Sequence, residues 1–173
     1  MRSIDGSGEA CRCCRHAREN LTHLAVCEKL GQVFEELRAM AGITQPKNER
    51  EKFRLALFLI PPDGKKVEEG WIYLHLLLWK HAVAHLVNID TLGEKYNPKS
   101  IWQPAWIRFK AKCEALQERA HDHLRLAESR AYPKPDCVKK SGPMLPLATL
   151  DEDGKLQWDK ETTKRIEDIL KRK

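Results

Sequence analysis

The chain has 173 residues, a net charge of +6 with histidine neutral, and charged side chains at 32% of its positions. This length suffices for one domain with its own hydrophobic core, and the helix-forming composition predicts a mostly α fold. The basic excess permits contact with the phosphates of RNA or DNA without requiring it. The sequence contains no P-loop, dinucleotide-binding glycine motif or paired catalytic carboxylates, so we predict that the protein is not an enzyme.

The first ten residues have the composition of a flexible start. They contain Asp5, Gly6 and Gly8 and lack the apolar core of a secretion signal. We therefore expect an intracellular protein, nuclear or cytoplasmic, in which cysteines stay reduced.

Residues 11–27 contain four of the six cysteines and two of the seven histidines. Cys11, Cys14, His23 and Cys27 give the spacing C-x2-C-x8-H-x3-C, which is typical of a closed tetrahedral Zn²⁺ site. Four protein ligands leave no position for water, so we predict a structural zinc knuckle. The alternatives are a cluster of free thiols, or one disulfide with spare cysteines.

The choice of ligands within this segment stays open at two positions. Cys13 is an alternative to Cys14, and His16 is a further donor within reach. Cys13 is most simply interpreted as a thiol that does not bind the metal.

A helix is predicted directly behind the first cysteines. Asn20 is a favourable N-cap, and apolar residues recur at helical spacing over residues 21–40. His23 and Cys27 then lie four residues apart on one face of this helix and form a helical chelate.

Three arginines precede the first acidic side chain of the knuckle. We predict that Arg12, Arg15 and Arg18, which come before Glu19, contact phosphates of a nucleic acid. The competing interpretation is that they are solvated loop charges.

At these residues the chain resembles a known family. The cysteine pair, Glu19, a Leu-Thr pair, and His23 and Cys27 at the start of an amphipathic helix resemble the zinc-binding segment that follows the reverse transcriptase in non-LTR retrotransposon polyproteins. The resemblance covers about residues 10–42. It implies nucleic-acid binding or an architectural role, and not catalysis, because the sequence lacks the polymerase Tyr-x-Asp-Asp motif.

Two more helices are predicted in the first half of the chain. One spans residues 49–59 and ends at Pro61-Pro62. The other spans residues 67–89, is apolar on nearly every side, and is expected to be the central helix, covered by its neighbours and stopped by Gly93.

Histidines and a lysine divide the apolar run of this central helix. They interrupt it before the ~20 apolar residues that a membrane span needs, so we predict no membrane association. Within the run, His81 and His85 lie on one helical face. We interpret them as core or partly solvated histidines and not as a second metal site, because no Glu follows the first of them as in zinc proteases.

The second half of the chain is predicted to contain a long helix and a small C-terminal unit. The helix begins at Ser100 or Gln103 and runs to residue 130, followed by an extended linker over residues 132–146. A short β-hairpin over residues 147–158 and a helix over residues 159–173 complete the chain.

These elements predict a helical bundle with an N-terminal zinc knuckle and a C-terminal hairpin plus helix. The expected divisions are residues 1–42 for the knuckle and first helix, 43–131 for the helical body, and 132–173 for the tail, packed on the body or on a partner. The leading prediction is a zinc-stabilised accessory protein that binds RNA or DNA. The alternative is a scaffold or subunit of a larger assembly, which docks on protein through exposed tryptophans and the C-terminal tail.

Overall fold

The computed structural model describes residues 10–15, 19–129, 148–150 and 155–171. Within these ranges the protein is mostly helical, with a cysteine-rich N-terminal segment and a short strand pair followed by a helix at the C-terminal end. This arrangement confirms the predicted fold class. The linker predicted over residues 132–146 lies outside the described residues.

The first predicted helix is divided in two. Asn20 caps α1 (Leu21–Val26) by accepting a hydrogen bond from the backbone N–H of His23 at 2.7 Å. At Cys27 the backbone leaves the helical conformation, with ψ at 123°, and α2 (Glu28–Met40) begins at the next residue. The prediction of one unbroken helix was wrong, because Cys27 turns the chain where its sulfur contacts the other cysteines.

The next two helices follow the predicted boundaries closely. The Asn48 side chain accepts a hydrogen bond from Glu51 N at 2.9 Å and caps α3 (Glu49–Phe58). Helix α4 (Glu69–Leu92) ends at Gly93, whose φ of +67° lies in the left-handed region that glycine adopts without strain.

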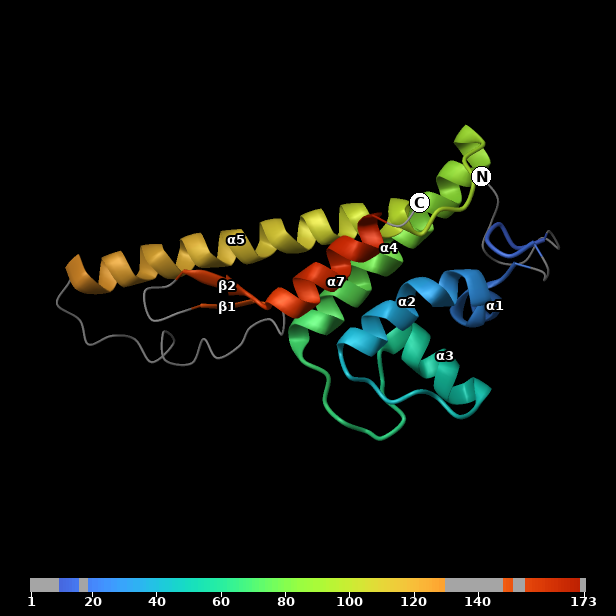
Figure 1. Ribbon diagram of the computed structural model, residues 1–173, viewed down its shortest axis with the longest axis horizontal. Coiled ribbons are helices and arrows are strands. Elements are labelled where there is room, and N and C mark those ends of the chain that lie inside the picture. The colour runs from blue at the N-terminus through green and yellow to red at the C-terminus, as the bar shows by residue number, and fades with distance from the viewer. Residues whose placement is uncertain (1–9, 16–18, 130–147, 151–154, 172–173) are drawn as a thin grey trace.

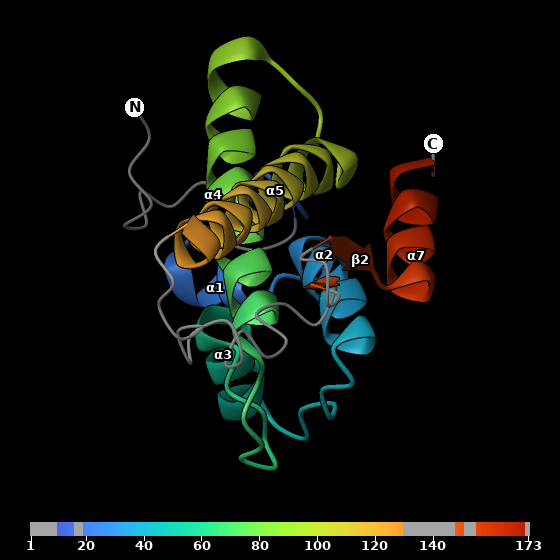
Figure 2. The same ribbon diagram turned by 90° about the vertical axis from the view of Figure 1, so that its left-hand side faces the viewer.

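Helix α4 is the centre of the fold. It packs against α5 (Lys99–Ser129) and against α2, and the views in Figures 1 and 2 show α5 crossing it while α1, α2 and α3 lie along another side. The largest fully buried side chains come from several helices and form one core: Leu30, Phe34, Leu37, Leu55, Leu74, Leu78, Leu86, Ile101, Trp102, Phe109 and Ile166.

The sequence led us to expect that α4 is covered by neighbours on nearly every side. The structure shows that one side is exposed. Ile72, Leu76, Val83 and Val87 are exposed, with Leu76 at 56%. Their spacing places them along one stripe of the helix. The buried stripe of α4 is therefore broad but leaves an aliphatic strip open to solvent.

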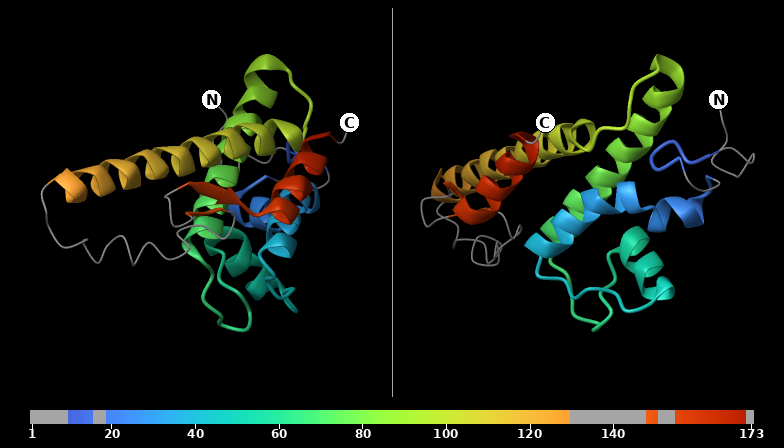
Figure 3. Two further views of the ribbon diagram at one scale, coloured as in Figure 1. Left: turned by 60° about the vertical axis from the view of Figure 1, so that its left-hand side comes forward. Right: turned by 45° about the vertical axis from the view of Figure 1, so that its right-hand side comes forward.

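The C-terminal elements pack on the long helix α5. Strands β1 (Ala148–Leu150) and β2 (Leu156–Trp158) form an antiparallel pair with Thr149 opposite Gln157. Figure 3 shows this pair and α7 (Lys160–Lys171) beside α5, whose far end extends away from the body. Ile166 and Ile169 of α7 enter the common core, so the tail helix is part of the same packed body.

Nowhere in the described ranges does a helix combine the length and the apolar character that a bilayer crossing requires.

Candidate metal centre

The four predicted ligands meet at one point of the structure. The ligand atoms of Cys11, Cys14, His23 and Cys27 all lie within 4.8 Å of one another. Cys11 and Cys14 come from a tight turn, His23 from α1, and Cys27 from the junction of α1 and α2. The cluster could therefore hold a metal ion, as the spacing predicts.

The distances suit a tetrahedral ion. The sulfurs of Cys11 and Cys27 are 3.9 Å apart, and Cys14 Sγ lies 3.3 Å from His23 Nε2. A regular tetrahedron with bonds of about 2.3 Å to sulfur and about 2.0 Å to nitrogen separates its ligand atoms by roughly 3.5–3.8 Å. These two pairs of donor atoms stand close to the separations that a four-coordinate zinc ion would impose, and all four ligand atoms lie within 4.8 Å of one another.

The buried cysteines at the cluster have pKa values that are shifted in opposite directions. Hydrogen bonding from Cys13 lowers the pKa of the Cys27 thiol, whereas burial raises the pKa of Cys11. Thiolates are the form in which cysteine binds metals. A cation at the centre would stabilise the charge that the fold already favours at Cys27.

Cys13 is buried beside the cluster without belonging to the set of four donors. Its pKa is raised, first by its hydrogen bond to Cys27 and then by burial. This agrees with the interpretation of Cys13 as a protonated neighbour. His16, the other spare donor, lies outside the described residues.

Arg12 is not a surface residue. Its guanidinium is 5% exposed and is bound on two sides: by Glu19, with Nε to Oε1 at 2.8 Å, and by Asp90 of α4, with Nη1 to Oδ2 at 2.7 Å. Nη1 also donates to the carbonyl of Leu86 at 3.0 Å. The prediction that Arg12 contacts phosphates was wrong, because its donors already fasten the knuckle to α4.

Glu19 completes this ion pair. Burial raises the pKa of Glu19, but hydrogen bonds from the Arg12 side chain and backbone outweigh it and hold the pKa below its usual value. The acidic residue of the predicted motif thus has a structural role that its position in the sequence did not reveal. Of the other two arginines, Arg15 is exposed and Arg18 lies outside the described residues.

A second contact joins the knuckle region to the loop after α4. Tyr96 is half-buried, and its hydroxyl donates a hydrogen bond to the carbonyl of Lys29 in the first turn of α2 at 2.7 Å. Burial raises the pKa of Tyr96, with the nearby cysteines adding to the effect. Arg12 therefore ties the knuckle to the C-terminal part of α4, and Tyr96 ties the loop after α4 to the first turn of α2.

Of the two α4 histidines considered as a second metal site, His85 has a structural partner. His85 is buried, and its Nε2 accepts a hydrogen bond from Asn97 N at 2.9 Å. In the described part of the chain, His81 and His85 belong to no group of three or more metal donors.

The tryptophans do not form an exposed docking patch, contrary to the expectation for a scaffold. Three of them are buried and the other two are half-buried, with Trp79 Nε1 donating to the Ala56 carbonyl at 2.6 Å. The aromatic side chains that the sequence offered for a partner are used in the core.

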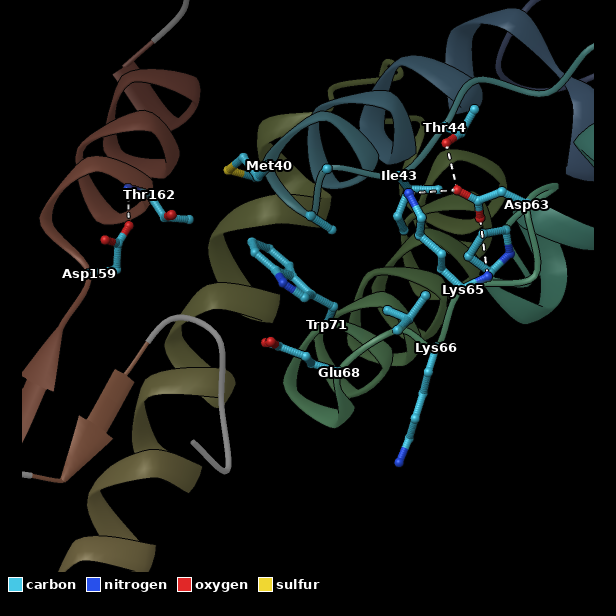
Figure 4. Close-up of a pocket in the computed structure, with 14 residues that line it drawn as sticks. Met40, Ile43, Thr44, Asp63, Lys65, Lys66, Glu68, Trp71, Asp159 and Thr162 are labelled. Carbon is cyan, nitrogen blue, oxygen red and sulfur yellow. Dashed lines mark hydrogen bonds and ion pairs between the residues drawn. The ribbon is translucent and has the colours of Figure 1, made fainter. Parts of the chain in front are cut away.

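The structure also contains a cavity of about 450 Å³ between the loop after α2, the loop before α4 and the start of α7. Figure 4 shows that Asp63 on its wall accepts a hydrogen bond from Thr44 and pairs with Lys65, while Asp159 caps α7 through Thr162. These two carboxylates already have partners within the protein.

Comparison with family models, curated proteins and solved structures found no match to this chain.

Proposed function

We propose that Cys11, Cys14, His23 and Cys27 bind one structural Zn²⁺ and that the protein is a helical accessory module which binds nucleic acid. The observation that carries the zinc assignment is the convergence of three sulfurs and one imidazole nitrogen within 4.8 Å. Soft thiolates with one imidazole suit Zn²⁺ better than the oxygen-seeking ions Mg²⁺ and Ca²⁺. No coordination position remains for a substrate, which supports a structural role.

The zinc ion would fix a segment with little secondary structure of its own. Residues 11–15 form only a turn, closed by the hydrogen bond from Arg15 N to the Cys11 carbonyl at 2.8 Å. Metal bonds, together with the Arg12 ion pairs, would hold this turn against α1 and α4.

The nucleic-acid part of the proposal is supported by the exposed face of α3, which packs against α1 of the knuckle. Arg50 and Arg54 lie on this face, Lys47 precedes it, and the Phe58 ring, 63% exposed, follows them at helical spacing. Among the described residues, none of these three cations is in an ion pair. Cations beside an exposed ring are the combination with which proteins bind single-stranded nucleic acid through phosphates and base stacking.

With Arg15 of the knuckle turn, the chain offers four exposed cations and a ring for contact with nucleic acid. They take the place of Arg12, which the sequence had assigned to phosphate contact. The resemblance to the retroelement zinc segment fits such a function.

The test is a binding titration of the zinc-loaded chain with single-stranded RNA and with duplex DNA, at about 50 mM and about 200 mM salt. Four phosphate contacts predict a slope of about −3 for log K against log salt with a single strand. Replacing Arg50 and Arg54 by Gln should halve this slope. The matched control is Arg108→Gln with Lys112→Gln, two exposed cations at the same spacing on α5, and it should leave the slope unchanged.

A second candidate function is a subunit of a protein assembly. The specific observation in its favour is the exposed aliphatic stripe of α4, Ile72, Leu76, Val83 and Val87. Salt-insensitive or absent binding to both nucleic acids would remove the first candidate and leave this one.

A further inference from the structure

A small cavity lies between α2 and α3, with a volume of about 240 Å³. Its walls come from α1, α2, the linker before α3, and α3 itself. Apolar wall atoms are contributed by Ala25, Val26, Phe34, Pro46 and Ala56. Typical ligand pockets span roughly 300–1,000 Å³, so this cavity has room only for a small molecule.

The unusual member of the lining is Arg38. This residue is 8% exposed, and its Nε has no hydrogen-bond partner in the described part of the chain. The acid in ion-pair range, Glu35, is 3.9 Å from Nη2 and is itself 61% exposed. Burial lowers the pKa of Arg38, yet a guanidinium stays charged in proteins.

The neighbouring side chain of His75 does not compensate the charge of Arg38 either. The His75 ring lies near Arg38 and offers it no negative charge. A buried cation with one distant, solvated partner is costly to the fold. An anion in the cavity would supply the missing partner.

We propose that this cavity binds a small molecule with a single carboxylate and a short apolar part, held by Arg38. The planar guanidinium fork matches a carboxylate in two parallel hydrogen bonds. Lys52 adds a second cation to the lining, whereas Glu28 and Glu35 add two negative charges. These glutamates disfavour a dianion, so a monoanionic carboxylate is favoured over sulfate or phosphate, and the apolar walls accept the rest of the molecule.

The test measures the thermal midpoint of the zinc-loaded full chain with sodium butyrate or benzoate, with sodium sulfate, and with sodium chloride at matched ionic strength. At about ten times its Kd, a carboxylate that binds only the folded state should raise the midpoint by roughly 3–6 °C. Arg38→Met should abolish the rise. The exposed Arg108→Met, on α5 and outside the cavity, should retain it.

Several outcomes would overturn the proposal. These are an equal rise with sulfate, a rise that persists in Arg38→Met, and no rise with either carboxylate. Should Arg38→Met fail to fold, the Arg38 Nε–H resonance of the wild-type protein provides the decision. Benzoate should shift this resonance, and an unchanged resonance at saturating benzoate would contradict the assignment.

Discussion

Replacing Arg12 by Met tests whether this residue fastens the knuckle to α4. The change removes the cation from Glu19, which is 10% exposed, and from Asp90, which is 19% exposed. Removing one partner of a buried ion pair costs roughly 3–5 kcal/mol. We expect a loss of about 3 kcal/mol in the free energy of unfolding, at the low end of that range, because water can still reach Asp90.

The assay is denaturant unfolding in excess zinc, so that the metal site stays loaded in both proteins. The control is Arg15→Met, since Arg15 is exposed in the same turn and its replacement should change stability by at most about 0.5 kcal/mol. Glu19→Gln in the Arg12→Met background should recover part of the loss, because it removes the buried uncompensated carboxylate. Equal effects of the two arginine replacements would refute the reasoning and would indicate that Arg12, like Arg15, contributes little to stability.

Two further predictions concern the helices around the site. Burial lowers the pKa of His75 to about 4, below its ordinary 6.5. The unfolded chain therefore binds the proton more readily than the folded protein. As a result, the free energy of unfolding falls as the pH drops from 6.5 towards 4. Relative to His75→Leu, the wild-type protein should lose about 3 kcal/mol between pH 7 and pH 4 in denaturant unfolding, and parallel pH profiles would contradict this. Asn48→Ala should cost about 1 kcal/mol through loss of the α3 cap, whereas Asn48→Asp should cost little, as circular dichroism melts would reveal.

The metal cluster was predictable from the sequence because its spacing is a local signal. Two cysteines in one turn and a His-to-Cys gap of four residues bring donors together whatever the remaining fold is. The same argument failed in its detail at Cys27, where the tertiary contact with Cys11 interrupts the helix that the apolar spacing predicted.

The role of Arg12 could not be predicted, because its partner Asp90 lies 78 residues away and no short-range pattern joins the two. Charge counting assigns such an arginine to the surface, where most arginines are found. Arg38 is a similar case: it follows Leu37 in an amphipathic helix, and only the packing of the folded chain reveals that it is buried.

The limits of α4 were predictable from Gly93 and from the apolar run, but its exposed stripe was not. A helix that is apolar on nearly every side indicates coverage by neighbours. How many neighbours the chain supplies is a property of the whole fold. Here α5 and α2 cover one broad side and leave Leu76 and Val83 open.

Metal analysis of the purified protein tests the central claim most directly. We expect about one zinc ion per chain, lost in Cys14→Ala and in Cys27→Ala and retained in Cys13→Ala, because Cys13 lies outside the four-donor set. A zinc-free wild-type protein, or a Cys13→Ala variant that loses its zinc while Cys14→Ala keeps it, would contradict the account.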